Sequence, residues 1–141
     1  MLVRQVMNRK VIIAKPEVNL KEACDVMTKL RIGSLIIFDS KKILGIVTST
    51  DILKAIARDG NPEAVLIDTV MSKNVKTIEP DEDIEDAVRL MMKHKIKKLP
   101  VVDGSKLVGI LTASDIVIIE PKLLESLASL ISVKISGYTG G

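Results

Sequence analysis

Aromatic residues are nearly absent from this sequence, which has one Phe, one Tyr and no Trp among 141 residues. The core must therefore be built from aliphatic side chains. Proteins that bind single-stranded nucleic acid stack bases on aromatic rings, so the composition argues against that class. The single cysteine, Cys24, excludes an internal disulfide and a CxxC metal site, and the single histidine, His94, excludes a multi-histidine metal centre.

The sequence also lacks the common motifs of catalysis and phosphate binding. It contains no GxxxxGK(S/T) loop, no GxGxxG turn and no GxSxG elbow, and it offers no evident pair of nucleophile and base. We therefore expect neither an enzyme nor a catalytic cofactor or metal.

Long apolar runs are missing as well. No uncharged stretch exceeds eight residues, whereas a membrane-spanning helix needs ~20 apolar residues. The N-terminus has no apolar segment of the signal-peptide kind. We expect a soluble, cytoplasmic protein.

What is present is typical of a small globular protein, with 47% hydrophobic and 28% charged residues and a net charge of +3. The length allows one domain or two very small ones. The sequence has few Gln and Asn residues and many Lys, Glu and Ile residues. This composition resembles that of archaeal or thermophilic proteins.

The chain is an internal repeat with a period of 64 residues. Segment 6–53 aligns with segment 70–117 without a gap, and 16 of the 48 positions are identical. Repeat units this small bury their apolar faces on each other. We expect repeat 1 over residues 1–64, repeat 2 over 65–120, and a C-terminal helix followed by a flexible tail over 121–141.

Each repeat predicts the order strand, helix, strand, strand, helix. In repeat 1, strand 11–14 precedes a helix capped by Asn19, and an apolar hairpin of strands 35–38 and 43–47 precedes a helix over 52–58. The second repeat has the corresponding strand 75–78, a helix starting at Asp83, strands 99–103 and 106–111, and a helix opened by 112–115. The predicted fold class is α/β, with two packed repeats related by a pseudo-two-fold axis.

These features resemble a tandem pair of CBS domains, also called a Bateman module. The resemblance is carried by Val70-Met71, by Thr77-Ile78-Glu79-Pro80, by Leu99-Pro100-Val101-Val102-Asp103 and by Gly-Ile-Leu-Thr-Ala-Ser-Asp over 109–115. Repeat 1 departs from the pattern at Ile36, where the family prefers Pro, and at Ile13, which matches Thr77.

The resemblance implies a stand-alone regulatory protein rather than an enzyme. In this family two clefts form between the repeats, and each can hold an adenine nucleotide or a related adenosyl compound. Members commonly form homodimers and regulate a partner protein by a shift in conformational population. The ligand could be AMP, ADP, ATP, S-adenosylmethionine, methylthioadenosine or NAD, and the basic residues described below favour AMP or ATP and hence energy sensing.

The two Thr-x-x-Asp motifs, at Thr48–Asp51 and Thr112–Asp115, have two interpretations. As a capping box, each would stabilise a helix start without any ligand. In the family, the Asp accepts hydrogen bonds from the ribose hydroxyls, for which two carboxylate oxygens are well suited. Thr48, Thr50, Thr112 and Ser114 would then reach ribose or phosphate. The two interpretations are compatible.

The basic run that ends in Lys97 and Lys98 also has two interpretations. It can be a solvated helix end, or the two lysines can contact a ligand's phosphate, as basic residues at the matching positions do in the AMP-activated kinase. Repeat 1 has Gly33-Ser34 there, so we expect unequal clefts. We do not expect nucleic-acid binding by this run, because it lacks aromatic neighbours.

Four strand residues complete the expected site. Ile13 and Thr77 lie where family members contact adenine, and Ile46 and Ile110 could pack against its face, although for any single one of them the interpretation as a core residue is the stronger. The alternative function is a ligand-free adaptor that acts through its dimer surface and through the C-terminal helix with its stripe of Leu123, Leu127, Leu130 and Ile131.

Overall fold

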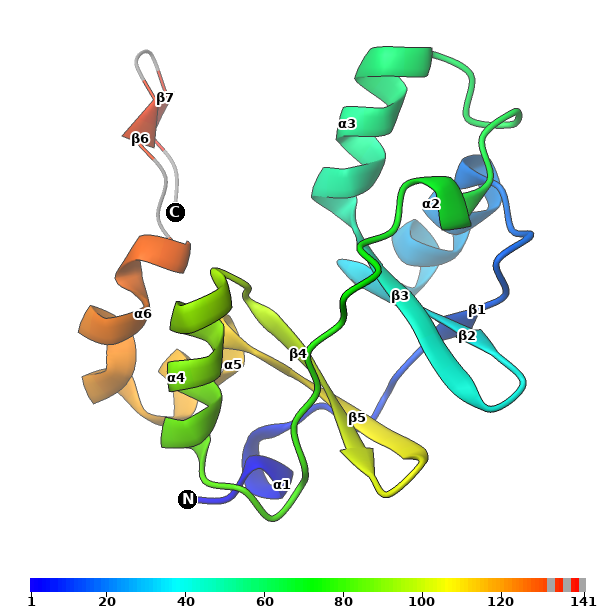
Figure 1. Cartoon of the computed structure of the whole chain (residues 1–141). Coiled ribbons are helices and arrows are strands. Elements are labelled where there is room, and N and C mark those ends of the chain that lie inside the picture. The colour runs from blue at the N-terminus through cyan, green and yellow to red at the C-terminus, as the bar shows by residue number, and fades with distance from the viewer. Residues whose placement is uncertain (132–133, 136–137, 140–141) are drawn as a thin grey trace. The chain divides into compact units, whose positions relative to one another are not determined.

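The computed structural model describes residues 1–131, 134–135 and 138–139 and divides into two compact units (Figure 1). Unit 1 combines residues 1–10 with residues 76–141, and unit 2 contains residues 11–75. The predicted α/β class, with two repeats and a C-terminal helix, is confirmed. No helix among the described residues is long and apolar enough to cross a membrane.

Unit 2 contains a three-stranded sheet and two helices. The sheet has the order β1-β2-β3, in which β1 (Ile13–Ala14) is parallel and β3 (Lys42–Thr48) antiparallel to β2 (Ser34–Asp39). The helices are α2 (Leu20–Leu30) and α3 (Ser49–Asp59), and a 3₁₀ turn, η1 (Ile67–Thr69), follows them. Asn19 caps α2 as predicted, since its side chain accepts a hydrogen bond from the Glu22 N–H.

Unit 1 repeats this plan with additions at both ends. Helix α4 (Ile84–His94), the hairpin of β4 (Lys98–Asp103) and β5 (Lys106–Thr112), and α5 (Ala113–Ile119) correspond to α2, β2, β3 and α3. The added elements are α1 (Val3–Val6), η2 (Pro121–Leu123), α6 (Leu124–Ile131), and the short strands β6 (Lys134–Ile135) and β7 (Tyr138–Thr139). The flexible tail expected over 136–141 lies partly outside the described residues.

The strand expected over 75–78 is wrong in its extent. Only Ile78 pairs with the hairpin, through a single parallel bridge to Val101. In unit 2 the matching ladder is longer because the Ile36 N–H donates to the Ile12 carbonyl oxygen at 3.2 Å. Pro100 stands at the equivalent position and has no N–H, so this bond cannot form in unit 1.

The Val-Met segment that opens each repeat pairs with the β-hairpin of the other repeat. Asn8 exchanges two backbone hydrogen bonds with Ile110 in unit 1 (2.8 and 2.9 Å), and Ser72 exchanges two with Ile46 in unit 2 (3.0 and 2.9 Å). Each compact unit is therefore completed by residues from outside its own sequence repeat.

Glycine makes this close approach possible. A Cβ at Gly45 would lie 2.6 Å from the Met71 sulfur and 2.7 Å from the Ser72 carbonyl oxygen, and a Cβ at Gly109 would lie 2.7 Å from the Met7 sulfur. Gly45 and Gly109 occupy the same position in the two repeats, so each repeat needs a residue without a side chain there.

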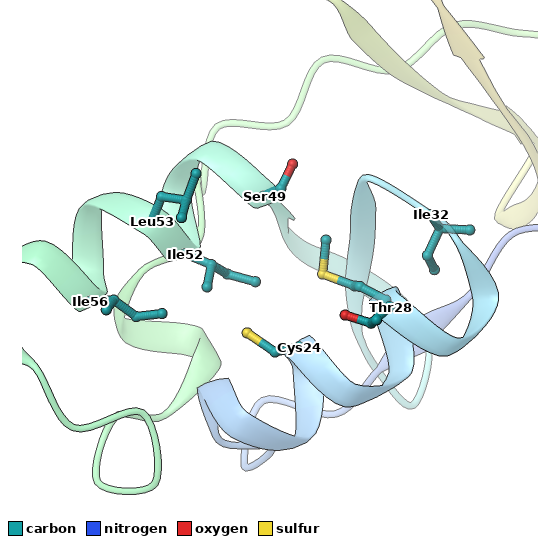
Figure 2. Close-up of a pocket in the computed structure, with 8 residues that line it drawn as sticks. Cys24, Thr28, Ile32, Ser49, Ile52, Leu53 and Ile56 are labelled. Carbon is teal, nitrogen blue, oxygen red and sulfur yellow. The ribbon is translucent and has the colours of Figure 1, made fainter.

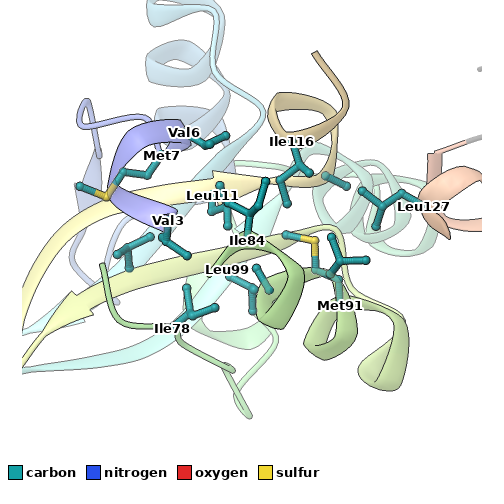
Figure 3. Packing of buried hydrophobic residues seen from close by; sticks show 14 residues of the cluster. Val3, Val6, Met7, Ile78, Ile84, Met91, Leu99, Leu111, Ile116 and Leu127 are labelled. Carbon is teal, nitrogen blue, oxygen red and sulfur yellow. The ribbon is translucent and has the colours of Figure 1, made fainter. Parts of the chain in front are cut away.

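Two separate aliphatic cores hold the units together. Unit 2 packs residues such as Leu20, Leu35 and Ile67 with Met71 at the edge, and unit 1 packs Val3 and Met7 of the N-terminal segment with α4, the hairpin and α5 (Figure 3). No polar or charged side chain is buried among the described residues.

Helix α6 belongs to the core of unit 1. Leu127 is fully buried and packs with α4 and α5, near Met91 and Ile116 (Figure 3). Leu123, Leu130 and Ile131 pack against the same core. The apolar stripe of this helix therefore packs against the core of unit 1, with Leu127 fully buried and Leu123, Leu130 and Ile131 partly buried.

The close approach at Gly45 predicts that Gly45→Ala destabilises the protein. We expect a loss of about 1–3 kcal/mol in the free energy of unfolding, because the Ser72 backbone cannot move away without losing its bonds to Ile46. Urea unfolding measures this loss. Lys54→Ala, at an exposed position of α3, is the control, and equal stability of the two variants would contradict the predicted contact.

Candidate functional site

The first Thr-x-x-Asp motif forms a complete capping box at the start of α3. The Asp51 N–H donates to Thr48 Oγ1 at 3.3 Å, and the Thr48 N–H donates to Asp51 Oδ2 at 2.9 Å. Thr48 and Asp51 are half-buried, whereas Thr50 is exposed. The structural interpretation of this motif is therefore realised, and Thr50 projects from the same helix start.

The second motif forms a similar cap at the start of α5. The Asp115 N–H donates to Thr112 Oγ1 at 3.1 Å. Thr112 and Asp115 are half-buried and Ser114 is exposed, which repeats the pattern of unit 2. Each unit thus presents one hydroxyl-rich helix start with a carboxylate in its first turn.

The candidate adenine-contacting residues lie in one row across each sheet. In unit 2, Ile13 pairs with Ile36, Ile36 pairs with Ile46, and Ile46 pairs with Ser72. Ile13 is 54% exposed, so it is not a core residue of the described structure, whereas Ile46 is half-buried. The row crosses β3 at Ile46, two residues before Thr48, so the side chains of Ile46 and Thr48 lie on the same face of the strand.

Unit 1 has the same row with different side chains. Ile110 pairs with Pro100 on one side and with Asn8 on the other. Thr77 precedes Ile78, whose N–H donates to the Pro100 carbonyl oxygen at 3.1 Å. Thr77 is exposed and Ile110 is half-buried, so a hydroxyl group stands where unit 2 has the side chain of Ile13.

The two lysines lie beside the second helix start. Lys98 pairs with Thr112 across the hairpin, and the Lys97 carbonyl oxygen accepts a bond from the Ala113 N–H at 2.8 Å. In unit 2 the same two places hold Ser34, opposite Thr48, and Gly33, which accepts from the Ser49 N–H at 3.0 Å. The two helix starts therefore differ by two cationic side chains.

The candidate residues divide between the two units. Unit 2 carries Ile13, Ile46, Thr48, Thr50 and Asp51, and unit 1 carries Thr77, Lys97, Lys98, Ile110, Thr112, Ser114 and Asp115. Within each unit these residues gather around one row of the sheet and the helix start that follows it.

Sequence reasoning missed Ser72 and Asn8 as neighbours of the site. Each extends the row beside Ile46 or Ile110 by an antiparallel bridge. The sequence signal for these two residues is the Val-Met pair that opens both repeats, because Asn8 and Ser72 each follow that pair directly.

Among the described residues, no group of three or more His, Cys, Asp or Glu side chains could hold a metal ion. Burial raises the pKa of the Cys24 thiol, and the nearby Asp25 acts in the same direction. Cys24 therefore stays protonated at neutral pH, which fits a packing residue and not a nucleophile.

Comparison with known families identifies both repeats. The family model for the CBS domain matches residues 3–58 and 67–120. An uncharacterized protein of Methanopyrus kandleri, MK0525, is 36% identical over 128 residues, which cover 89% of this chain and 65% of the relative. The chain thus spans less than two thirds of the length of that relative.

Solved structures of CBS pairs have the same fold. The CBS domain pair of protein MJ0100, in complex with 5′-methylthioadenosine and S-adenosyl-L-methionine, is 33% identical, with a TM-score of 0.78 over 86% of this chain and 97% of that one. A hexameric CBS-CP12 protein from bloom-forming cyanobacteria is 26% identical, with a TM-score of 0.78 over 89% of this chain and 73% of that one.

The cap at α3 predicts a measurable loss on Thr48→Ala. Removing Oγ1 leaves the Asp51 N–H without its acceptor, so we expect the free energy of unfolding to fall by about 1 kcal/mol. Chemical denaturation measures the change. The matched control is Thr50→Ala, at an exposed position two residues further along. If Thr48→Ala is no less stable than the control, the hydroxyl does not act as a cap.

Proposed function

Because the chain belongs to the CBS domain family, as a tandem pair of repeats, we propose that it is a regulatory module that binds an adenosine-containing compound. One arrangement, found in both units, supports this proposal most strongly. A half-buried isoleucine on a strand, Ile46 or Ile110, lies two residues before the Thr-x-x-Asp motif that starts the next helix. The bound state of the MJ0100 pair supports the ligand class.

The roles of the residues follow from their chemistry. Asp51 and Asp115 would accept hydrogen bonds from the two ribose hydroxyls, because a carboxylate offers two acceptor oxygens to a vicinal diol. The exposed hydroxyls of Thr50 and Ser114, with Thr48 and Thr112, would contact ribose or phosphate. Ile46 and Ile110 would pack against the adenine face, and Ile13 and Thr77 would flank its edge.

The charge difference between the helix starts supports different ligand preferences. Lys97 and Lys98 lie beside Thr112 and would attract the phosphate of AMP, ADP or ATP. Gly33 and Ser34 supply no such charge beside Thr48, and an uncharged group would suit that position better. We therefore propose a phosphorylated nucleotide beside Thr112, and leave the thioether compounds and NAD as ligands to be compared in the same experiment.

Regulation would act through a population shift. A ligand can change the conformation that the chain presents only by binding one arrangement more tightly than another. The proposed output is recognition by a regulated partner protein in the cytoplasm. We also expect a homodimer, and the hexameric CBS-CP12 neighbour supports association of copies in general. The proposal includes no reaction catalysed by the chain.

Calorimetric titration with AMP, ATP, methylthioadenosine and S-adenosylmethionine tests the proposal. We expect binding in the micromolar range, and we expect Asp51→Asn and Asp115→Asn each to weaken it, because an amide keeps one acceptor oxygen and adds a donor. Asp103→Asn, at the exposed end of β4, is the matched control.

Two outcomes contradict the proposal. The first is the absence of heat with all four compounds in protein shown to be free of co-purified nucleotide. The second is binding that neither Asp51→Asn nor Asp115→Asn reduces. Urea unfolding of the same variants separates loss of binding from loss of the helix cap.

A further inference from the structure

The sulfur atoms of two methionines lie against the two hairpin glycines. In unit 2 the Met71 sulfur lies 2.6 Å from the place that a Cβ would occupy at Gly45, and in unit 1 the Met7 sulfur lies 2.7 Å from that place at Gly109. Each thioether therefore packs directly against the backbone of a hairpin. On the side that faces the glycine, the sulfur has no room for an added atom.

The residue that follows Met71 attaches the opening segment to β3. The Ser72 N–H donates to the Ile46 carbonyl oxygen at 2.9 Å, and the Ile46 N–H donates to the Ser72 carbonyl oxygen at 3.0 Å. This pair is an isolated bridge and not part of a longer ladder. A movement of the Met71 side chain away from Gly45 therefore pulls on the backbone that makes both bonds.

The two methionines that contact glycine differ in their access to solvent. Met7 is 9% exposed and belongs to the core of unit 1. Met71 is half-buried and packs at the edge of the core of unit 2. A dissolved oxidant therefore reaches the Met71 sulfur more easily, and Met7 provides the same glycine contact in a protected setting.

Met71 is also distinct from the other methionines of the chain. Met27 and Met91 are buried, so an oxidant has little access to their sulfurs. Met92 is exposed on α4 and lies outside the core cluster of unit 1 as the structure describes it. Oxidation of Met92 is therefore expected to disturb little packing, whereas Met71 combines access to solvent with a close backbone contact.

Cys24 carries the only thiol of the chain and is the other sulfur that an oxidant could attack. It lies on α2 and faces Ile52 of α3 across the pocket between the two helices (Figure 2). Burial raises the pKa of this thiol, and the thiolate is the reactive form. Cys24 therefore reacts slowly at neutral pH, and a Cys24→Ala variant separates its contribution from that of Met71.

We propose that Met71 is a reversible oxidation site, at which a peroxide converts the thioether to a sulfoxide and so releases the opening segment from β3. The peroxide O–O bond breaks, one oxygen atom forms an S–O bond, and the other leaves as water. The sulfur loses two electrons and the peroxide gains them. The product side chain is polar and larger than the thioether.

The sulfoxide cannot keep the position of the thioether. Its oxygen is a polar group that loses free energy when it is buried without a hydrogen bond, so it turns toward water. Met71 then leaves Gly45, and the two bonds between Ser72 and Ile46 open. A ligand beside Ile46 would also bind more weakly, and this last consequence alone rests on the proposed function.

Treatment of the full chain with hydrogen peroxide, in the absence of any adenosine compound, tests the inference. Peptide mass spectrometry measures the oxidation of each methionine, and hydrogen exchange followed by NMR measures the opening of the Ser72 and Ile46 amides. We expect Met71 to oxidise before Met7, and exchange of the two amides to become at least about tenfold faster after oxidation. Methionine sulfoxide reductase is expected to restore slow exchange.

Three variants assign the effect to one sulfur atom. Met71→Leu keeps a side chain of similar volume but has no sulfur, so we expect its exchange to be unaffected by peroxide. Met92→Leu is the matched control at an exposed methionine, and it is expected to remain as sensitive as the original protein. Cys24→Ala is expected to remain equally sensitive.

Three results would overturn the inference. One is a Met71 sulfur that stays reduced when Met92 is fully oxidised, and another is complete oxidation of Met71 with unchanged exchange at Ser72 and Ile46. The third is exchange in Met71→Leu that peroxide accelerates as much as in the original protein. All three are measured without ligand, so failure here is distinguishable from failure of the ligand proposal.

Discussion

The whole structure depends on two glycines that let a backbone segment lie against each hairpin. At Gly45 and Gly109 any side chain would collide with the methionine and the carbonyl group of the opening segment. Because those segments come from outside the repeat that they complete, the chain passes between the two compact units twice, after residue 10 and after residue 75. Removing either sequence repeat would therefore leave the compact unit of the other repeat without its opening segment.

The proposed sites would use the same residues for folding and for binding. Asp51 already accepts the Thr48 N–H through Oδ2, and a carboxylate has acceptor capacity beyond that bond. A capped helix start is therefore pre-organised for a polar ligand, and its side chains need little ordering when the ligand arrives. The exposed hydroxyls beside each cap, at Thr50 and Ser114, have no such structural duty among the contacts described above. The start of α5 has Lys97 and Lys98 beside it, where the start of α3 has Gly33 and Ser34.

Much of the fold could be predicted because local signals agree with each other and occur twice. The sequence predicts the 64-residue period, the Asn19 cap, the helix start at Asp83 and the two hairpins. The short pairing at Ile78 follows from Pro100, which lacks the required N–H. The alignment of the repeats suggests equal strand lengths and therefore predicts a strand that is too long. The exchange of opening segments and the burial of Leu127 depend on long-range packing, which periodicity cannot reveal. The rows around Ile46 and Ile110 likewise required the register of the sheets.

We propose that the two Thr-x-x-Asp helix starts are ligand sites as well as helix caps. Backbone amide NMR during addition of methylthioadenosine or AMP tests it most directly, because each residue reports separately. The account predicts that the largest shifts fall on residues 48–51 or 112–115 and on the sheet rows through Ile46 or Ile110. Shifts confined to other surfaces, or none at ligand concentrations in the millimolar range, would contradict it and leave these motifs as helix caps alone.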